Sequence, residues 1–201
     1  MLDARLRPLI DPPLNAVGRV LAELGVSANG LTAIGIALGL GAGAALAHGL
    51  FMTGLALIIV NRLIDGLDGA VARATQLTDF GGYLDIVGDF VFYLAVPLGF
   101  GLAAPANLVP ALALLACFGL TGISFLAFAA IAAKRGLETS AHGRKSFFYN
   151  TGLAEGTETI IVFIAFCLWP AQFPVIAMGY AGLCILTVIQ RTAAAWVSFG
   201  R

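Results

Sequence analysis

The stretch Asp65–Asp89, DGLDGAVARATQLTDFGGYLDIVGD, places two pairs of aspartates inside sequence that otherwise reads as membrane-spanning. Asp65 and Asp68 follow an apolar run at 51–60, and Asp85 and Asp89 come before another at 90–104. Residues three or four apart share one face of a helix. Two antiparallel helices joined by the short polar loop would hold both pairs at a similar depth, so we predict that the four carboxylates converge.

Converging carboxylates repel one another unless a cation compensates them, and inside a membrane they are rare and functional. Oxygen ligands without His or Cys suit Mg²⁺, Mn²⁺ or Ca²⁺ rather than Zn²⁺. Small residues clear space beside the acids, and Arg73 offers a fixed fork for a phosphate. Two other interpretations stay open, a structural ion-pair network that includes Arg62 and a path for conducting cations. The small residues are Gly66, Gly69, Ala70, Ala72, Gly81 and Gly82.

The same stretch resembles the signature of the CDP-alcohol phosphotransferases, integral membrane enzymes of phospholipid head-group synthesis. Upstream, residues 28–32 (ANGLT) are similar to the Pro-Asn-x-x-Thr that opens the first span in many members. The chain departs from the pattern at Phe90, where many members carry Lys or Arg, and at Arg62, one turn before the first aspartate. The matching residues are Asp65-x-x-Asp68-Gly69-x-x-Ala72-Arg73, then seven residues, then Gly81-x-x-x-Asp85-x-x-x-Asp89.

The resemblance implies transfer of a substituted phosphate from a CDP-alcohol, most often CDP-diacylglycerol, to an acceptor alcohol with release of CMP. It implies Mg²⁺ or Mn²⁺ as cofactor, membrane lipids as surroundings, a homodimer, and no nucleic-acid partner. Asp89 is then the candidate general base. The rival prediction is a non-enzymatic membrane cation carrier that uses the same acids. The implied metal ligands are Asp65, Asp68, Asp85 and Asp89, and the implied CDP-binding residues are Asp65, Gly69, Ala72, Arg73 and Gly81.

Composition predicts a single all-α membrane domain over residues 1–201. The chain is 60% hydrophobic, 11% charged and of zero net charge, with a mean hydropathy of +0.96. At ~20 residues per span, its length holds about six transmembrane helices and little else. Cys117, Cys167 and Cys184 fall in apolar runs and are interpreted as small hydrophobic residues. The expected spans are 31–50, 51–75, 82–104, 108–133, 157–169 and 175–199.

Residues 1–26 mix leucines and valines at helical spacing with arginines. After its prolines, this segment is expected to form an amphipathic helix that lies on the cytoplasmic membrane surface or packs on the domain. The turns at 48–50, 104–107 and 169–174 contain no Lys or Arg. The positive-inside rule therefore places both termini and the acid cluster on the cytoplasmic side of the inner membrane.

The acceptor alcohol is not determined by the sequence. A charged segment lies before the fifth span, and a basic residue lies in the sixth. Their cations would suit a phosphorylated polyol, whereas the carboxylates of the segment would suit an amino-alcohol. We favour the polyol. An interfacial anchor is the alternative role of this segment. Arg62 is interpreted as the partner of a carboxylate. The candidate acceptor-binding residues are Arg144, Lys145, Tyr149, Glu155, Glu158 and Arg191.

Overall fold

The computed structural model describes residues 3–136 and 152–200, and these residues form helices joined by turns, without a β-strand. The predicted all-α class is therefore confirmed. The main helices are α1 (Asp3–Glu23), α2 (Ala28–Ala47), α3 (Phe51–Ala74), α4 (Asp79–Ala103), α5 (Leu108–Lys134), α6 (Gly156–Leu168) and α7 (Phe173–Phe199), with short 3₁₀ turns η1 (Pro105–Asn107) and η3 (Pro170–Gln172).

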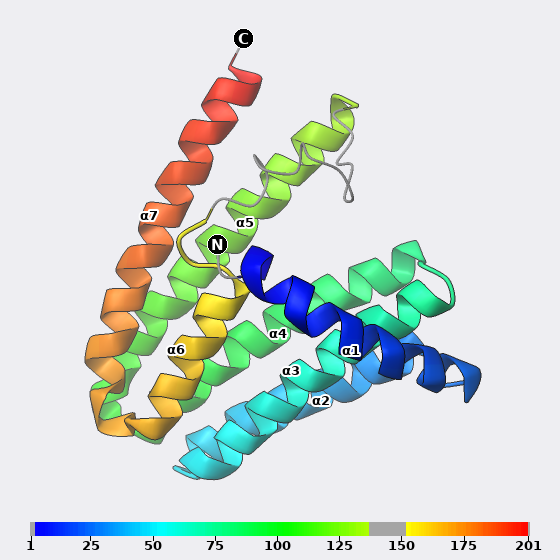
Figure 1. The fold of residues 1–201 in the computed structure, drawn as a ribbon. Coiled ribbons are helices and arrows are strands. Elements are labelled where there is room, and N and C mark those ends of the chain that lie inside the picture. The colour runs from blue at the N-terminus through cyan, green and yellow to red at the C-terminus, as the bar shows by residue number, and fades with distance from the viewer. Residues whose placement is uncertain (1–2, 137–151, 201) are drawn as a thin grey trace.

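The helices form two groups that meet along α4 and α5 (Figure 1). In the first group α2 packs against both α3 and α4, and α1 lies across α3. In the second group α5 packs against α7, and α6 contacts both α7 and α3. The two aspartate-bearing helices, α3 and α4, therefore stand between α2 on one side and α5 and α6 on the other.

Four helices are long and apolar enough to cross a membrane within the described part of the chain: α2, α4, α5 with its preceding turn, and α7 with its preceding turn. α3 has the length but carries two arginines and two aspartates, and α6 has only 13 residues. The chain is thus an integral membrane protein, and the expected number of six spans stays a prediction.

Side-chain caps and glycines fix the boundaries near the site. Ser27 and Thr78 each accept a hydrogen bond from a backbone N–H three residues later, at 3.1 and 3.0 Å, which caps α2 and α4. Because Thr78 caps it, α4 begins at Asp79 rather than at the predicted residue 82. Gly25 and Gly49 have φ of 80° and 73°, so they end α1 and α2 in a conformation that side chains disfavour.

Small residues let the helices approach closely, as in many membrane proteins. A Cβ added to Gly43 of α2 would lie 2.7 Å from the Ala95 carbonyl oxygen of α4. A fully buried aromatic cluster fills the centre of the molecule, where the Phe100 and Phe173 rings stack with centroids 4.7 Å apart. The three cysteines are buried and unpaired with one another, as expected for small hydrophobic residues.

α1 begins before its prolines, whereas the sequence predicts a helix only after them. Pro8, Pro12 and Pro13 all lie inside it, although each proline removes a backbone donor. Packing on α3 compensates: a Cβ on Gly18 would lie 2.6 Å from the Ala70 Cβ. α1 therefore covers one side of the helix that carries the first aspartate pair, as Figure 1 shows.

Candidate functional site

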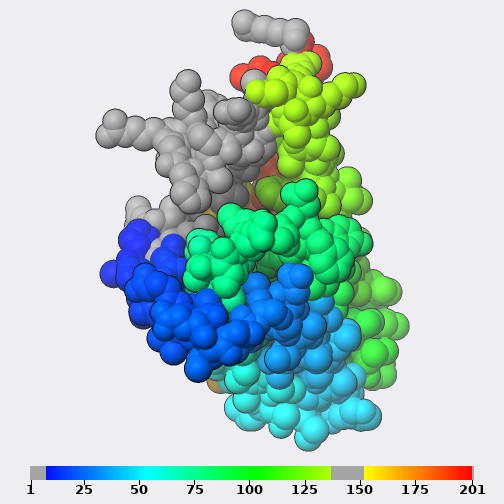
Figure 2. All heavy atoms as spheres, turned by 90° about the vertical axis from the view of Figure 1, so that its right-hand side faces the viewer, coloured from blue at the N-terminus to red at the C-terminus, as the bar shows by residue number. Residues whose placement is uncertain are grey.

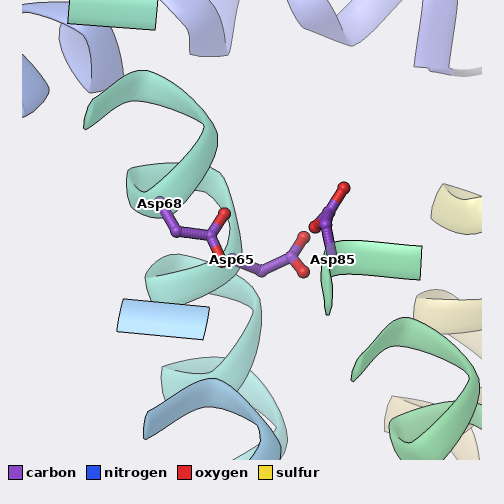
Figure 3. Close-up of side chains that lie close together, drawn as sticks. All are labelled: Asp65, Asp68 and Asp85. Atoms are coloured by element: carbon purple, nitrogen blue, oxygen red, sulfur yellow. The ribbon is translucent and has the colours of Figure 1, made fainter. Parts of the chain in front are cut away.

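Three of the four predicted aspartates come together between α3 and α4. Asp65, Asp68 and Asp85 each place one carboxylate oxygen within 4.8 Å of the others. Figure 3 shows the α3 pair and Asp85 of α4 pointing toward one another across the gap between the two helices. Three hard oxygen donors at this separation suit a divalent cation such as Mg²⁺ or Mn²⁺. The residues present therefore fit the metal that the sequence predicts.

A third helix holds one of these ligands in place. Thr32 of α2 donates its hydroxyl hydrogen to Asp68 Oδ2 at 2.7 Å, and both residues are buried, at 8% and 5% exposure. A hydroxyl that donates to a carboxylate forms a charge-assisted hydrogen bond, which is stronger than one between uncharged groups. Thr32 closes the ANGLT motif, so the upstream motif and the aspartate motif meet in space.

The start of α4 contacts the same upstream motif. A Cβ on Gly81 would lie 3.2 Å from the Asn29 side-chain oxygen and 2.9 Å from Thr78 Oγ1. Figure 2 views this end of the molecule and shows the α1–α2 region, in blue, beside the beginning of α4, in green. A larger residue at position 81 would require the Thr78 and Asn29 side chains to move.

Asp89, the fourth aspartate, is paired with Arg62. Its Oδ1 accepts a hydrogen bond from Arg62 Nη1 at 2.9 Å, and the same nitrogen lies 3.5 Å from Asp65 Oδ2. The interpretation of Arg62 as a partner of carboxylates is thus confirmed. Arg62 also donates from Nε to Asn61 Oδ1 at 2.7 Å, and its guanidinium carbon lies 4.0 Å from the centre of the Phe92 ring.

A cavity of about 630 Å³ joins the four aspartates to the second helix group. Its volume falls in the range of small-molecule sites. Gly69 and Arg73 also line it, whereas Ala72 and Gly81 do not appear among its lining residues in the described part of the chain. Arg73 donates two hydrogen bonds to Asn15 Oδ1, at 2.9 and 3.2 Å, so α1 orients this guanidinium at the cavity wall.

The far side of the cavity carries a cation from α7. Arg191 donates from Nη1 to the Thr121 carbonyl oxygen at 2.9 Å, and its guanidinium carbon lies 5.6 Å from the centre of the Phe125 ring. Its buried Nε has no acceptor among the described residues. Arg191 therefore contributes a fixed guanidinium to the cavity wall.

An irregular segment before α6 also borders the cavity. Leu153 and Ala154 donate their backbone N–H groups to Thr187 Oγ1 of α7, at 3.1 and 3.0 Å. Glu155 accepts from the Gly152 N–H at 2.9 Å. These bonds satisfy the backbone N–H groups of 152–154 within the protein.

The structure places only part of the predicted acceptor site. Glu155 and Arg191 line the cavity, and Glu158 lies in α6 without lining it. The predicted Arg144, Lys145 and Tyr149 lie outside the described residues. The sequence reading missed Asn61, which is 2% exposed and donates to the Gly35 carbonyl at 2.7 Å. A single polar residue beside an arginine in an apolar run was the signal for it.

Comparisons with known sequences agree with this geometry. The sequence profile described as CDP-alcohol phosphatidyltransferase matches residues 25–197. The inner membrane protein YnjF of Escherichia coli (strain K12) is 48% identical over 192 residues, which cover 95% of this chain and 93% of YnjF. The archaetidylinositol phosphate synthase of Pyrococcus horikoshii is 35% identical over 101 residues, which cover 49% of this chain and 53% of the synthase.

Solved structures share the fold. The phosphatidylinositol phosphate synthase PgsA1 of Mycobacterium tuberculosis, with CDP-DAG bound, superposes with a TM-score of 0.66 at 22% identity and covers 91% of this chain and 93% of its own. The same synthase in complex with manganese and citrate gives a TM-score of 0.65 at 21% identity, covering 91% of this chain and 88% of that one. At this identity the likeness establishes the arrangement of helices.

Proposed function

The chain belongs to the CDP-alcohol phosphatidyltransferase family, and we propose that it transfers a phosphatidyl-type group from CDP-diacylglycerol to an acceptor alcohol with release of CMP. The observation that carries this proposal is the set of three converging aspartates at the wall of a cavity that holds basic residues on both sides. A solved structure of the same fold has CDP-DAG bound, which supports the donor.

We propose that Asp65, Asp68 and Asp85 hold the divalent metal, Mg²⁺ or Mn²⁺, and that Asp65, Gly69 and Arg73 contact the CDP group. When bound, such an ion neutralises charge on the diphosphate and orients it for displacement. Arg73 would add a fixed fork for a phosphate. Ala72 and Gly81 remain proposed to give the cytidine room, although neither is among the described residues that line the cavity. The complex of the structural neighbour with manganese supports the metal assignment.

The fourth aspartate is the proposed general base. Asp89 lines the cavity with 34% of its side chain exposed, while Arg62 fixes one of its oxygens. The acceptor hydroxyl would lose its proton to Asp89 as its oxygen bonds to the β-phosphorus of the donor. The bond between that phosphorus and the bridging oxygen breaks, and its electron pair leaves with CMP.

We propose that the acceptor is a phosphorylated polyol. Arg191 supports this choice because it brings a guanidinium, which binds phosphate well, to the cavity wall. The name of the archaeal relative, a synthase of an inositol phosphate lipid, points in the same direction. Glu155 is engaged by the Gly152 N–H, which makes it less suited to bind an amino-alcohol. Arg144, Lys145, Tyr149 and Glu158 remain proposed second contributors.

We also propose six spans in a homodimer, with both termini and the cavity mouth facing the cytoplasm. α3 has 24 residues, enough to cross the hydrocarbon core at ~1.5 Å per residue. α6 is shorter, and the segment at 152–155 that precedes it is satisfied by protein within the fold. α1 exposes Ile10, Val17 and Val20, which fits a helix that rests on α3 and also touches the membrane surface.

The test is a transfer assay with the purified protein in detergent. Labelled CDP-diacylglycerol and Mn²⁺ are incubated with inositol phosphate, glycerol 3-phosphate, inositol, serine, ethanolamine or choline. We expect CMP and a labelled lipid product with a phosphorylated polyol. No CMP release with any acceptor would contradict the proposal, and product with an amino-alcohol alone would reverse the choice of acceptor.

Two further measurements distinguish the enzyme from a cation carrier and the acceptor site from the donor site. CMP should raise the unfolding temperature only when Mn²⁺ is present, whereas a cation carrier would respond to Mn²⁺ alone. Arg191→Gln should raise KM for the acceptor and leave KM for the CDP-lipid nearly unchanged. Equal changes in both KM values would indicate a structural role for Arg191.

A further inference from the structure

We propose that the Arg62 guanidinium is a resident cation that takes the place of a second divalent ion beside Asp65 and Asp89, so that each chain holds one ion. Arg62 is a positioning residue in this view, since it acts through the two carboxylates. The inference rests on the metal-binding part of the proposed function and specifies how many ions the four aspartates take.

Arg62 lies between two of the aspartates. One nitrogen of Arg62 lies 2.9 Å from Asp89 Oδ1 and 3.5 Å from Asp65 Oδ2, so it stands between oxygens on two different helices. Asp65, Asp68 and Asp85 form the metal-competent group. In two-metal sites the ions are commonly about 3.5–4 Å apart and share carboxylates. Here the position between Asp65 and Asp89 already holds a positive charge.

Further contacts, to Asn61 and Phe92, hold the Arg62 guanidinium in place. Its Nε donates to Asn61 Oδ1 at 2.7 Å, and Asn61 in turn donates to the Gly35 carbonyl of α2 at 2.7 Å. The fully buried Phe92 ring lies 4.0 Å from the guanidinium carbon. Only 14% of the Arg62 side chain is exposed. Moving it away would leave a buried cation without its carboxylates, which is strongly unfavourable.

Phe90 packs against the neighbouring helix α5. This residue follows Asp89, and its ring lies directly against Gly122 of α5, where a Cβ would collide with it. Position 90 therefore serves helix packing. The cation that pairs with Asp89 comes from α3, where Arg62 stands.

The experiment counts ions. Purified full-length protein in detergent is titrated with Mn²⁺, and bound ions per chain are measured by electron paramagnetic resonance and by elemental analysis. We expect about one Mn²⁺ per wild-type chain and about two in Arg62→Met, because removing the cation frees two carboxylates that a second ion can share. Arg62→Lys keeps the charge and should keep the count near one.

Two controls separate this role from general effects of charge and folding. Arg73→Gln removes a cation from the same cavity that bonds to Asn15, and it should leave the count unchanged. Asp89→Asn should also leave one ion bound at near wild-type affinity, because in this proposal Asp89 faces Arg62 and not the ion. This variant keeps the test decisive if Arg62→Met does not fold.

Three results would overturn the inference: two ions in the wild type, one ion in a folded Arg62→Met, or a large loss of Mn²⁺ affinity in Asp89→Asn. Two ions in Arg62→Lys would overturn the argument from charge. A wild-type protein that binds no divalent ion would overturn the metal-dependent function itself, so the two failures are distinguishable.

Discussion

Replacing Thr32 with valine tests whether α2 positions a metal ligand on α3. The Thr32 hydroxyl donates to the buried Asp68 Oδ2 at 2.7 Å, and valine has a similar shape without the hydroxyl. A hydrogen bond to a charged group contributes roughly 1.5–3 kcal/mol, and about 1.4 kcal/mol corresponds to tenfold in affinity. Because residues that orient metal ligands typically change affinity by about 10- to 100-fold, we expect a loss of that size for Mn²⁺.

The assay is a Mn²⁺ titration of the purified protein followed by electron paramagnetic resonance, which reports free Mn²⁺ and hence the dissociation constant. Thr32→Ser keeps the hydroxyl and should bind nearly as well as wild type. Thr192→Val is the matched control, since the exposed Thr192 hydroxyl bonds to the Val188 carbonyl of its own helix at 2.8 Å. If Thr32→Val and Thr192→Val bind Mn²⁺ equally well, the proposed positioning of Asp68 by α2 is refuted.

Three further predictions concern the donor site and the topology. Asp85→Asn should abolish CMP release without lowering the unfolding temperature, because it removes a ligand charge at an exposed position; a variant that keeps its activity would exclude Asp85 from the metal site. Arg73→Lys should raise KM for the CDP-lipid, since one ammonium cannot replace a fork on a phosphate, and an unchanged KM would argue against phosphate binding. Cysteines at Ala106 and Gln172 should react with an impermeant thiol reagent from the non-cytoplasmic side, and one at Gly136 only after permeabilisation; the opposite pattern would reverse the proposed orientation.

The sequence predicted those parts of the site that depend on local spacing. Asp65 and Asp68 share a helix face because they are three residues apart, and the short loop to α4 leaves Asp85 little freedom to lie elsewhere. These predictions depend on helix geometry alone, which is why they agree with the structure.

Contacts between distant segments were beyond sequence reasoning. Arg62 had four aspartates within reach, and only packing of α3 against α4 selects Asp89 and Asp65 as its partners. Asn15 precedes Arg73 by 58 residues, and nothing in the spacing connects them. The start of α1 was misjudged because local proline rules do not include the tertiary contact of Gly18 with Ala70 that stabilises the helix.

Helix packing, rather than a loop, sets the spacing between the aspartates and Arg191. The aspartates belong to α3 and α4, whereas Arg191 belongs to α7 and is held by the Thr121 carbonyl of α5. The Phe90 ring of α4 lies against Gly122 of α5, next to Thr121 in the chain. This one contact therefore connects the helix that carries Asp89 with the helix that orients Arg191. Since a packed interface resists continuous deformation, the α4–α5 contact would fix the distance that the proposed phosphorylated acceptor bridges between Arg191 and Asp89.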